Sequence, residues 1–226
     1  SHDPLVVKYT IADGVKWSDG TAVDAADLLL QWAALSRALD TPDFDAAEYT
    51  DPDTGEFTSD FPTDVVYFDS GADPTTGLGL VSTLPEVSDD KKSITLTYDA
   101  PFVDWELVFS APLPAHVVAK NALGIDDNQK AKDAIYDAIE NDDKTALASI
   151  SSFWNSGFNF TEMPSNPDLV LSSGPYVITD FVADQYVTLT ANKQYTGANQ
   201  AKVEEITVRF ITDPLAAVQA LQNGEV

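Results

Sequence analysis

The side chains that most often carry nucleophilic or metal chemistry are scarce in this sequence. It contains no cysteine, and its two histidines are His2 and His116. The lack of cysteine excludes thiol catalysis, thiolate zinc sites and a disulfide scaffold. Neither histidine stands in a recognisable motif with a nucleophilic serine, and the sequence has no Gly-x-x-x-x-Gly-Lys-Ser/Thr phosphate loop. We therefore predict no catalytic residue and no cofactor.

Carboxylates are the abundant reactive groups, with 37 Asp and Glu side chains among 226 residues. Two carboxylates that flank a glycosidic bond can hydrolyse it, but so many acids bring some pair together by chance. A carboxylate-dependent glycoside hydrolase is therefore the less favoured alternative. Residues 51–56 resemble the start of a calcium loop, yet Gly55 stands fifth rather than sixth, and Pro62 occupies the twelfth position instead of Glu. We predict no metal site.

The balance of charge limits the partners. With only 12 basic residues the formal net charge is −25, and residues 40–73 contain eleven acids and no Lys or Arg. Such a field repels nucleic-acid backbones and anionic lipid surfaces. No stretch approaches the roughly 18 consecutive apolar residues of a membrane span. The acidic stretch is interpreted as a solvated surface, and the alternative is the contact surface of a secreted acidic interaction module.

Capping and turn signals define the first elements. Residues 5–11 predict a strand, and the two Asp-Gly pairs within residues 13–20 predict a hairpin-like excursion after it. Asp24, followed three residues later by Asp27, predicts the start of a helix. The apolar positions of this helix recur at helical spacing and predict one core face. These positions are Leu28, Trp32, Leu35 and Leu39.

The middle of the chain alternates loops with helices. We predict a loop-rich acidic insert over residues 40–90, with short strands at 65–68 and 79–84, and then a strand at 94–98. A helical stretch follows over residues 114–156. Its first helix is bracketed by Pro114 and Gly124, and its remainder carries two apolar faces interrupted near residue 142.

The pattern changes near residue 170, where we place a domain boundary. Residues 176–182, 186–191 and 204–211 predict three successive strands, and a helix follows from Pro214. The predicted elements include both strands and helices, and the predicted fold class is α+β.

Several motifs occur in a fixed order along the chain, and together they resemble solute-binding protein family 5 of ABC importers. They are residues 13–21 (DGVKWSDGT), 112–117 (PLPAHV), 173–176 (SGPY), 192–197 (NKQYTG) and 206–211 (ITVRFI). Gln194 and Thr196 stand where the family usually has Pro and Trp. Each motif also has a structural reason: glycine permits positive φ in the turns, and proline fixes φ before a strand.

The resemblance implies a periplasmic-binding-protein-like fragment of type II. Residues 1–170 would form the inserted α/β domain, and residues 171–226 part of the mixed sheet of the first lobe. The implied function is the substrate-binding component of an ABC importer, which binds oligopeptides or similar small solutes and passes them to the permease. It is not an enzyme. The implied location is extracytoplasmic, as a cell-surface lipoprotein or a periplasmic protein. Candidate cleft residues are Ser172, Ser173 and Trp105.

The implied absence of the second lobe leads to two expectations, one about solute affinity and one about self-association. Family members bury the solute between two lobes, so we expect only the full-length protein to bind it with useful affinity. We also expect exposed sheet edges near residues 176–211, which would allow self-association.

Overall fold

The computed structural model describes residues 4–110 and 112–225. These residues divide into two compact units. Unit 1 comprises the chain up to Ala12 together with Val23–Phe158, and unit 2 comprises Asp13–Ala22 together with the chain from Asn159 onward. Among the described residues, no helix combines the length and the apolar character needed to cross a membrane.

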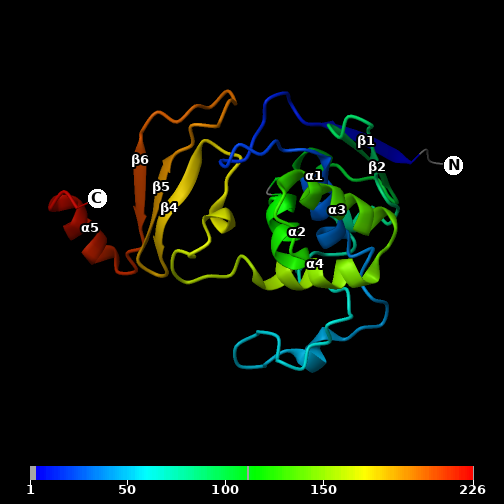
Figure 1. Cartoon of the computed structure of the whole chain (residues 1–226). Helices are drawn as coiled ribbons and strands as arrows, with labels where there is room; N and C mark the ends of the chain where they lie inside the picture. Colours follow the sequence, from blue (N-terminus) through cyan, green and yellow to red (C-terminus); the bar gives the residue numbers. More distant parts are fainter. Residues whose placement is uncertain (1–3, 111, 226) are drawn as a thin grey trace. The chain divides into compact units, whose positions relative to one another are not determined.

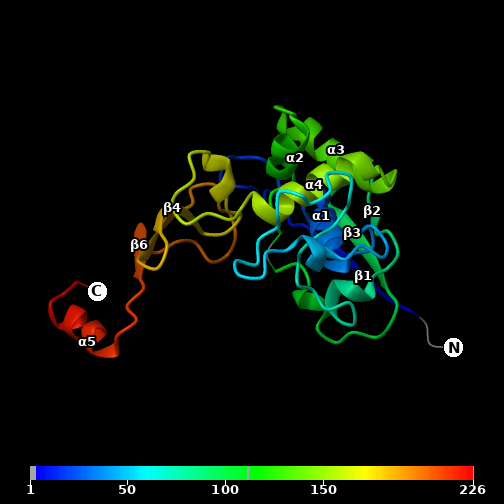
Figure 2. The same ribbon diagram turned by 90° about the horizontal axis from the view of Figure 1, so that it is seen from below.

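The described residues of unit 1 form a small antiparallel sheet and four α-helices, and Figures 1 and 2 show these elements. The strand order is β1-β3-β2, and the register pairs Leu5 with Tyr98 and Glu86 with Thr95. The strands are β1 (Leu5–Thr10), β2 (Glu86–Val87) and β3 (Ser93–Tyr98), and the helices are α1 (Ala25–Ser36), α2 (Ala115–Leu123), α3 (Asn128–Glu140) and α4 (Lys144–Ser156). Three single-turn 3-10 helices complete the unit: Ala46–Tyr49, Gly77–Leu80 and Trp105–Leu107.

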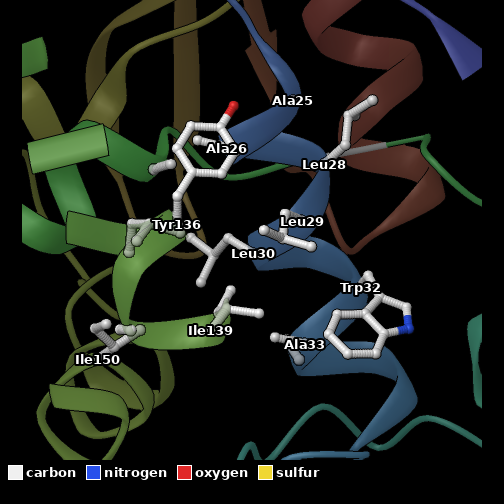
Figure 3. Packing of buried hydrophobic residues seen from close by; sticks show 14 of the residues in the cluster. Ala25, Ala26, Leu28, Leu29, Leu30, Trp32, Ala33, Tyr136, Ile139 and Ile150 are labelled. Atoms are coloured by element: carbon white, nitrogen blue, oxygen red, sulfur yellow. The ribbon is translucent and has the colours of Figure 1, made fainter. Parts of the chain in front are cut away.

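Helix α1 forms the centre of the core. The capping box predicted from Asp24 and Asp27 is present. Every residue from Ala25 to Ala34 is buried, so the helix is covered on all sides rather than along the single face predicted. It ends at Ser36 because Arg37 adopts the left-handed conformation, with φ of 56°. Figure 3 shows Leu29, Leu30 and Ala33 facing Tyr136, Ile139 and Ile150 of α3 and α4.

The acidic insert contains no strand at 65–68 or 79–84, so that prediction was wrong. Val66 and Phe68 are fully buried, but side chains rather than a neighbouring strand bind the backbone. The amide of Val66 donates to Thr41 Oγ1 at 3.1 Å, and the amide of Phe68 donates to Asp40 Oδ1 at 3.2 Å. The Asn155 side chain donates to the carbonyl of Tyr67 at 2.8 Å. Figure 1 shows the insert, in cyan, extending from the helices of unit 1.

Unit 2 contains a three-stranded antiparallel sheet in the order β4-β5-β6. Its elements are β4 (Tyr176–Val182), β5 (Tyr186–Ala191), β6 (Glu205–Arg209), α5 (Pro214–Gln222) and the 3-10 helix Pro167–Val170. The hairpin Asp13–Ala22 joins this unit, because Ser18 and Gly14 accept hydrogen bonds from Ser172 and Thr196. The two compact units divide after Phe158, whereas the predicted domain boundary near residue 170 stays a prediction.

Little of unit 2 is buried. Of its described residues, only Trp17, Asn192 and Ala220 are buried. Large apolar side chains of its last strand and helix lie open to solvent: Val208 is 43% exposed and Leu215 is 74% exposed. A sheet and an amphipathic helix normally bury their apolar faces against another layer, and unit 2 as described has no such layer.

Candidate functional site

Two of the predicted site residues, Ser172 and Ser173, lie in the turn that leads into β4. Both are half-buried. The Ser172 hydroxyl accepts the amide of Gly174 at 3.0 Å, which closes a local turn. Pro175 then fixes φ before the first residue of the strand. The turn is therefore shaped by its own sequence before any contact with the rest of unit 2.

Asn192, at the end of β5, holds this turn against the sheet. Its side-chain amide donates to the carbonyl of Gly174 at 2.8 Å and to that of Ser172 at 3.3 Å. Its Oδ1 accepts the amide of Gln194 at 2.9 Å. Because proline has no N–H, the Gln194 that replaces the usual proline supplies a donor that the family motif lacks. Asn192 is 7% exposed, so these bonds are shielded from water.

The hairpin Asp13–Ala22 supports the same turn from the other side. The amide of Ser172 donates to Ser18 Oγ at 3.2 Å. Trp17, at 3% exposure, anchors the hairpin, and its backbone amide and carbonyl bond to Thr21 and Gly20. The Trp-Ser-Asp-Gly turn thus acts as scaffold in a specific way: it holds the Ser18 hydroxyl where it accepts the amide of Ser172.

A pocket of about 500 Å³ opens beside the turn within unit 2. Its lining is mainly apolar and includes Leu171, Val177 and Ile178, with Ser18, Asn192 and Lys193 as polar members. Lys193 is exposed and supplies a cation. An apolar pocket with a few fixed polar groups is the usual form of a small-solute site.

Trp105, the third predicted residue, lies in unit 1, so the three residues do not form one cluster within either unit. It is half-buried in the 3-10 helix Trp105–Leu107. Its carbonyl accepts the hydroxyl of Tyr9 at 2.6 Å. Burial raises the pKa of Tyr9, and the hydrogen bond with Tyr98 raises it further. Tyr9 therefore stays protonated and able to donate at any physiological pH.

Neither Asn192 nor Ser18 was named as a site residue from the sequence. Both residues stand in motifs that carry the family resemblance, at residues 192–197 and 13–21. Their place in these motifs is the sequence feature that could have identified them. Within the described residues, no group of three or more His, Asp or Glu side chains is arranged to hold a metal ion.

Comparison with known families decides the identity of the chain. The model of the family described as bacterial extracellular solute-binding proteins, family 5 Middle, matches residues 1–226. The chain belongs to this family. The α+β, periplasmic-binding-protein-like fold class is thereby confirmed, and the family is one of solute-binding proteins rather than enzymes. Because the family is extracellular, the predicted extracytoplasmic location is confirmed as well.

Individual relatives agree with this family assignment. An uncharacterized lipoprotein of Mycobacterium leprae is 30% identical over 212 residues, which cover 91% of this chain and 31% of that protein. A protein of Brucella ovis that carries the name of an ABC transporter peptide-binding protein is 43% identical over 56 residues, or 25% of this chain and 10% of that protein. The solved structure of the periplasmic EDTA-binding protein EppA superimposes with a TM-score of 0.60 and 24% identity, covering 98% of this chain and 30% of that one. The chain thus spans about a third of the Mycobacterium leprae protein and of EppA.

Proposed function

We propose that this chain is part of a longer solute-binding protein that captures an oligopeptide, or a similar small solute, outside the cell and delivers it to an ABC permease. One observation carries the proposal within the family: unit 2 offers a fixed turn and an apolar pocket, yet only three of its described residues are buried. A sheet and helix with so few buried residues suit a lobe whose core is completed by additional residues of a longer protein. The solute would then bind as two lobes close.

In this proposal unit 1 is the inserted domain and unit 2 is part of the first lobe. Unit 1 has its own core of 27 buried apolar residues, which suits an independently stable insertion. After the part of unit 1 that ends at Ala12, the chain enters unit 2 over Asp13–Ala22, returns to unit 1 for Val23–Phe158 and re-enters unit 2 at Asn159. The long segment Val23–Phe158 therefore lies between two parts of unit 2, as expected of an inserted domain.

Ser172 and Ser173 are the proposed solute contacts in unit 2. The Asn192 side chain already occupies the carbonyl groups of Ser172 and Gly174. The Ser173 hydroxyl forms no hydrogen bond within the described residues, so it has capacity for a polar group of the solute. Trp105 is the proposed contact from unit 1, where its ring would supply apolar area.

A peptide is the proposed solute class because the Brucella ovis relative, 43% identical over its matched quarter of the chain, carries the name of a peptide-binding protein. A chelated metal is the competing solute class, on the strength of the likeness to the EDTA-binding protein EppA. Exposed Lys193 beside the pocket is compatible with either a peptide carboxylate or an anionic chelate.

The test is a thermal-shift screen of the full-length gene product against di-, tri-, penta- and nonapeptides, metal–EDTA chelates and oligosaccharides. A ligand at 100 times its Kd stabilises the folded state by about 2.7 kcal/mol. For a protein of several hundred residues this corresponds to a rise in Tm of about 2–4 °C or more. We expect peptides to produce the largest rise. A screen in which only chelates raise Tm would overturn the peptide assignment, and no rise with any ligand would overturn the proposed function.

A further inference from the structure

Unit 1 contains a second pocket, separate in the fold from the turn of unit 2. Its volume is about 300 Å³, and its lining is predominantly apolar. Leu35 of α1 and Leu78 of the 3-10 helix Gly77–Leu80 form part of the wall, and Phe102, Leu107 and Val108 form the rest of the apolar surface. This volume is at the lower end of the range for small-molecule sites, so it suits a short aliphatic chain or a single ring.

One wall of this pocket, residues 102–108, is tied to the core by aromatic and polar contacts. The Gln31 side-chain amide of α1 donates to the carbonyl of Val108 at 3.1 Å. The hydroxyl of Tyr9 donates to the carbonyl of Trp105 at 2.6 Å. The ring of Phe102 stacks on that of Tyr98, with centroids 6.0 Å apart. These bonds fix the wall in place before any ligand arrives, which lowers the entropic cost of binding.

The other wall, residues 72–79, is also held in place by close packing and hydrogen bonds. A Cβ at Gly79 would lie 2.5 Å from the carbonyl oxygen of Asp73, so the turn at Asp73 closes on Gly79 only because that residue is glycine. Val81, which follows this wall, donates its amide to Leu78 at 3.0 Å. Its carbonyl accepts the indole N–H of buried Trp32 at 2.9 Å. Both walls therefore have their backbones anchored to α1 or to the sheet.

The charged side chains at the pocket are acidic. Asp73 and Asp104 both line it and are exposed, and the lining contains no Lys, Arg or His. Asp73 accepts the hydroxyl and the amide of Thr75 at 2.6 and 2.7 Å, and these bonds lower its pKa. Asp104 precedes the 3-10 helix Trp105–Leu107, but its side chain accepts no capping hydrogen bond from that helix. Its carboxylate is therefore available to a ligand.

We propose that this pocket binds a short apolar group that carries a cation, such as an aliphatic or aromatic amine. The apolar portion would replace water against Leu35, Leu78 and Leu107, and the ammonium would lie at the rim beside Asp104 and Asp73. Leu107, at 68% exposure, would lose much of its contact with water on binding, which is the expected source of affinity. The lining residues all belong to unit 1, and Trp105, the contact proposed for the transported solute, is not one of them although its neighbours Asp104 and Leu107 are.

Three probes with one hexyl chain test the proposal on the 226-residue chain: hexylammonium, 1-hexanol and hexanoate. Binding is followed by NMR chemical shifts at low ionic strength. We expect hexylammonium to bind best, with its largest shifts at Gly77, Gly79 and Leu107, and hexanoate to bind worst. Each exposed carboxylate should contribute about a two- to fivefold preference for the cation, and this preference should fall with added salt.

Single substitutions distinguish binding in the pocket from general attraction of a cation to the negatively charged chain. Asp104→Asn should weaken hexylammonium about two- to fivefold and leave hexanol unchanged, whereas Leu107→Asn should weaken both. Asp126→Asn removes the same charge from an exposed position outside the pocket and should change neither. Equal binding of the three probes, shifts confined to other residues, or the same loss in D126N as in D104N would overturn the proposal.

Discussion

The ammonium of Lys132 on α3 lies 3.0 Å from the carboxylate of Asp27 on α1, and both side chains are fully buried. The same carboxylate accepts the amide of Ala115, the first residue of α2, at 2.8 Å, and the amide of Asp24 at 3.0 Å. Burial raises the pKa of Asp27, while Lys132 and the backbone donors oppose that rise. One carboxylate therefore links three helices of unit 1.

Removing the cation of this pair should strongly destabilise the fold of unit 1. Lys132→Met leaves a buried, uncompensated carboxylate, so we expect a loss of about 3–5 kcal/mol in the free energy of unfolding. Urea denaturation followed by tryptophan fluorescence measures it. Lys144→Met is the matched control, because Lys144 pairs with Asp142 at the surface, where both side chains are about half exposed, and it should cost under about 1 kcal/mol. A similar cost for both variants would contradict the importance of burial.

Alkaline pH should destabilise unit 1 through Tyr136. Burial raises the pKa of Tyr136, and the carboxylates of Asp24 and Asp27 raise it further. Above about pH 10 the unfolded chain releases this proton and the folded chain retains it, so stability present below pH 10 is lost as pH rises. The loss is up to about 1.4 kcal/mol per pH unit for one group. Tyr136→Phe should make the dependence shallower by that amount in urea titrations between pH 9 and 11. An unchanged slope would refute this assignment.

The turn at Ser172 should depend on Asn192. Asn192→Ala removes two donated bonds and one accepted bond at a buried position, and we expect a cost of about 1–3 kcal/mol. The loss should appear locally, as faster amide hydrogen exchange over residues 172–177 and at Gln194. Asn121→Ala is the control, because that side chain bonds only its own helix at an exposed site. Exchange that is unaffected in N192A would show that the turn is held by other contacts.

The open face of unit 2 should promote self-association of the 226-residue chain. Among the described residues β6 pairs with β5 alone, and the outer edge of β4 has only the isolated bridge of Val182 with Glu162. Leu215 and Val218 of α5 are 74% and 53% exposed. Light scattering should show a mass that rises with concentration, and Leu215→Lys with Val218→Lys should reduce the rise. Val103→Lys, which changes an apolar residue of unit 1 that is 85% exposed, serves as the control. A strictly monomeric wild-type chain would exclude this association.

Local signals predicted the elements better than the contacts between them. The start of α1 follows from Asp24 and Asp27, which are three residues apart and interact directly. The bonds from Asp27 to Ala115 and Lys132 span 88 and 105 residues, and no local pattern specifies such partners. The predicted strand at 65–68 failed for the same reason, because the polar side chains that bind its backbone come from distant segments.

The predicted site residues Ser172 and Ser173 follow from a motif that opens a strand, and their role as solute contacts stays a prediction. The pocket of unit 2 is lined by their neighbours Leu171 and Val177 and not by the two serines themselves. The groups that fix them, Asn192 and Ser18, are 20 and 154 residues from Ser172. Their motifs were visible, but which turn they support depends on the register of β4 against β5 and on the packing of the hairpin, neither of which is encoded locally.

Isothermal titration calorimetry of a nonapeptide into two proteins, the full-length gene product and the 226-residue chain, tests the central claim most directly. The account predicts micromolar or tighter binding, a ΔG of about −8 kcal/mol or better, to the full-length protein and no measurable binding to the chain alone, because the proposed site is divided between two lobes and a solute site buries most of its ligand. Micromolar binding by the isolated chain would contradict the division of the site between lobes. If the full-length protein binds neither this peptide nor any solute of the thermal-shift panel, the assignment of a solute-binding function is wrong.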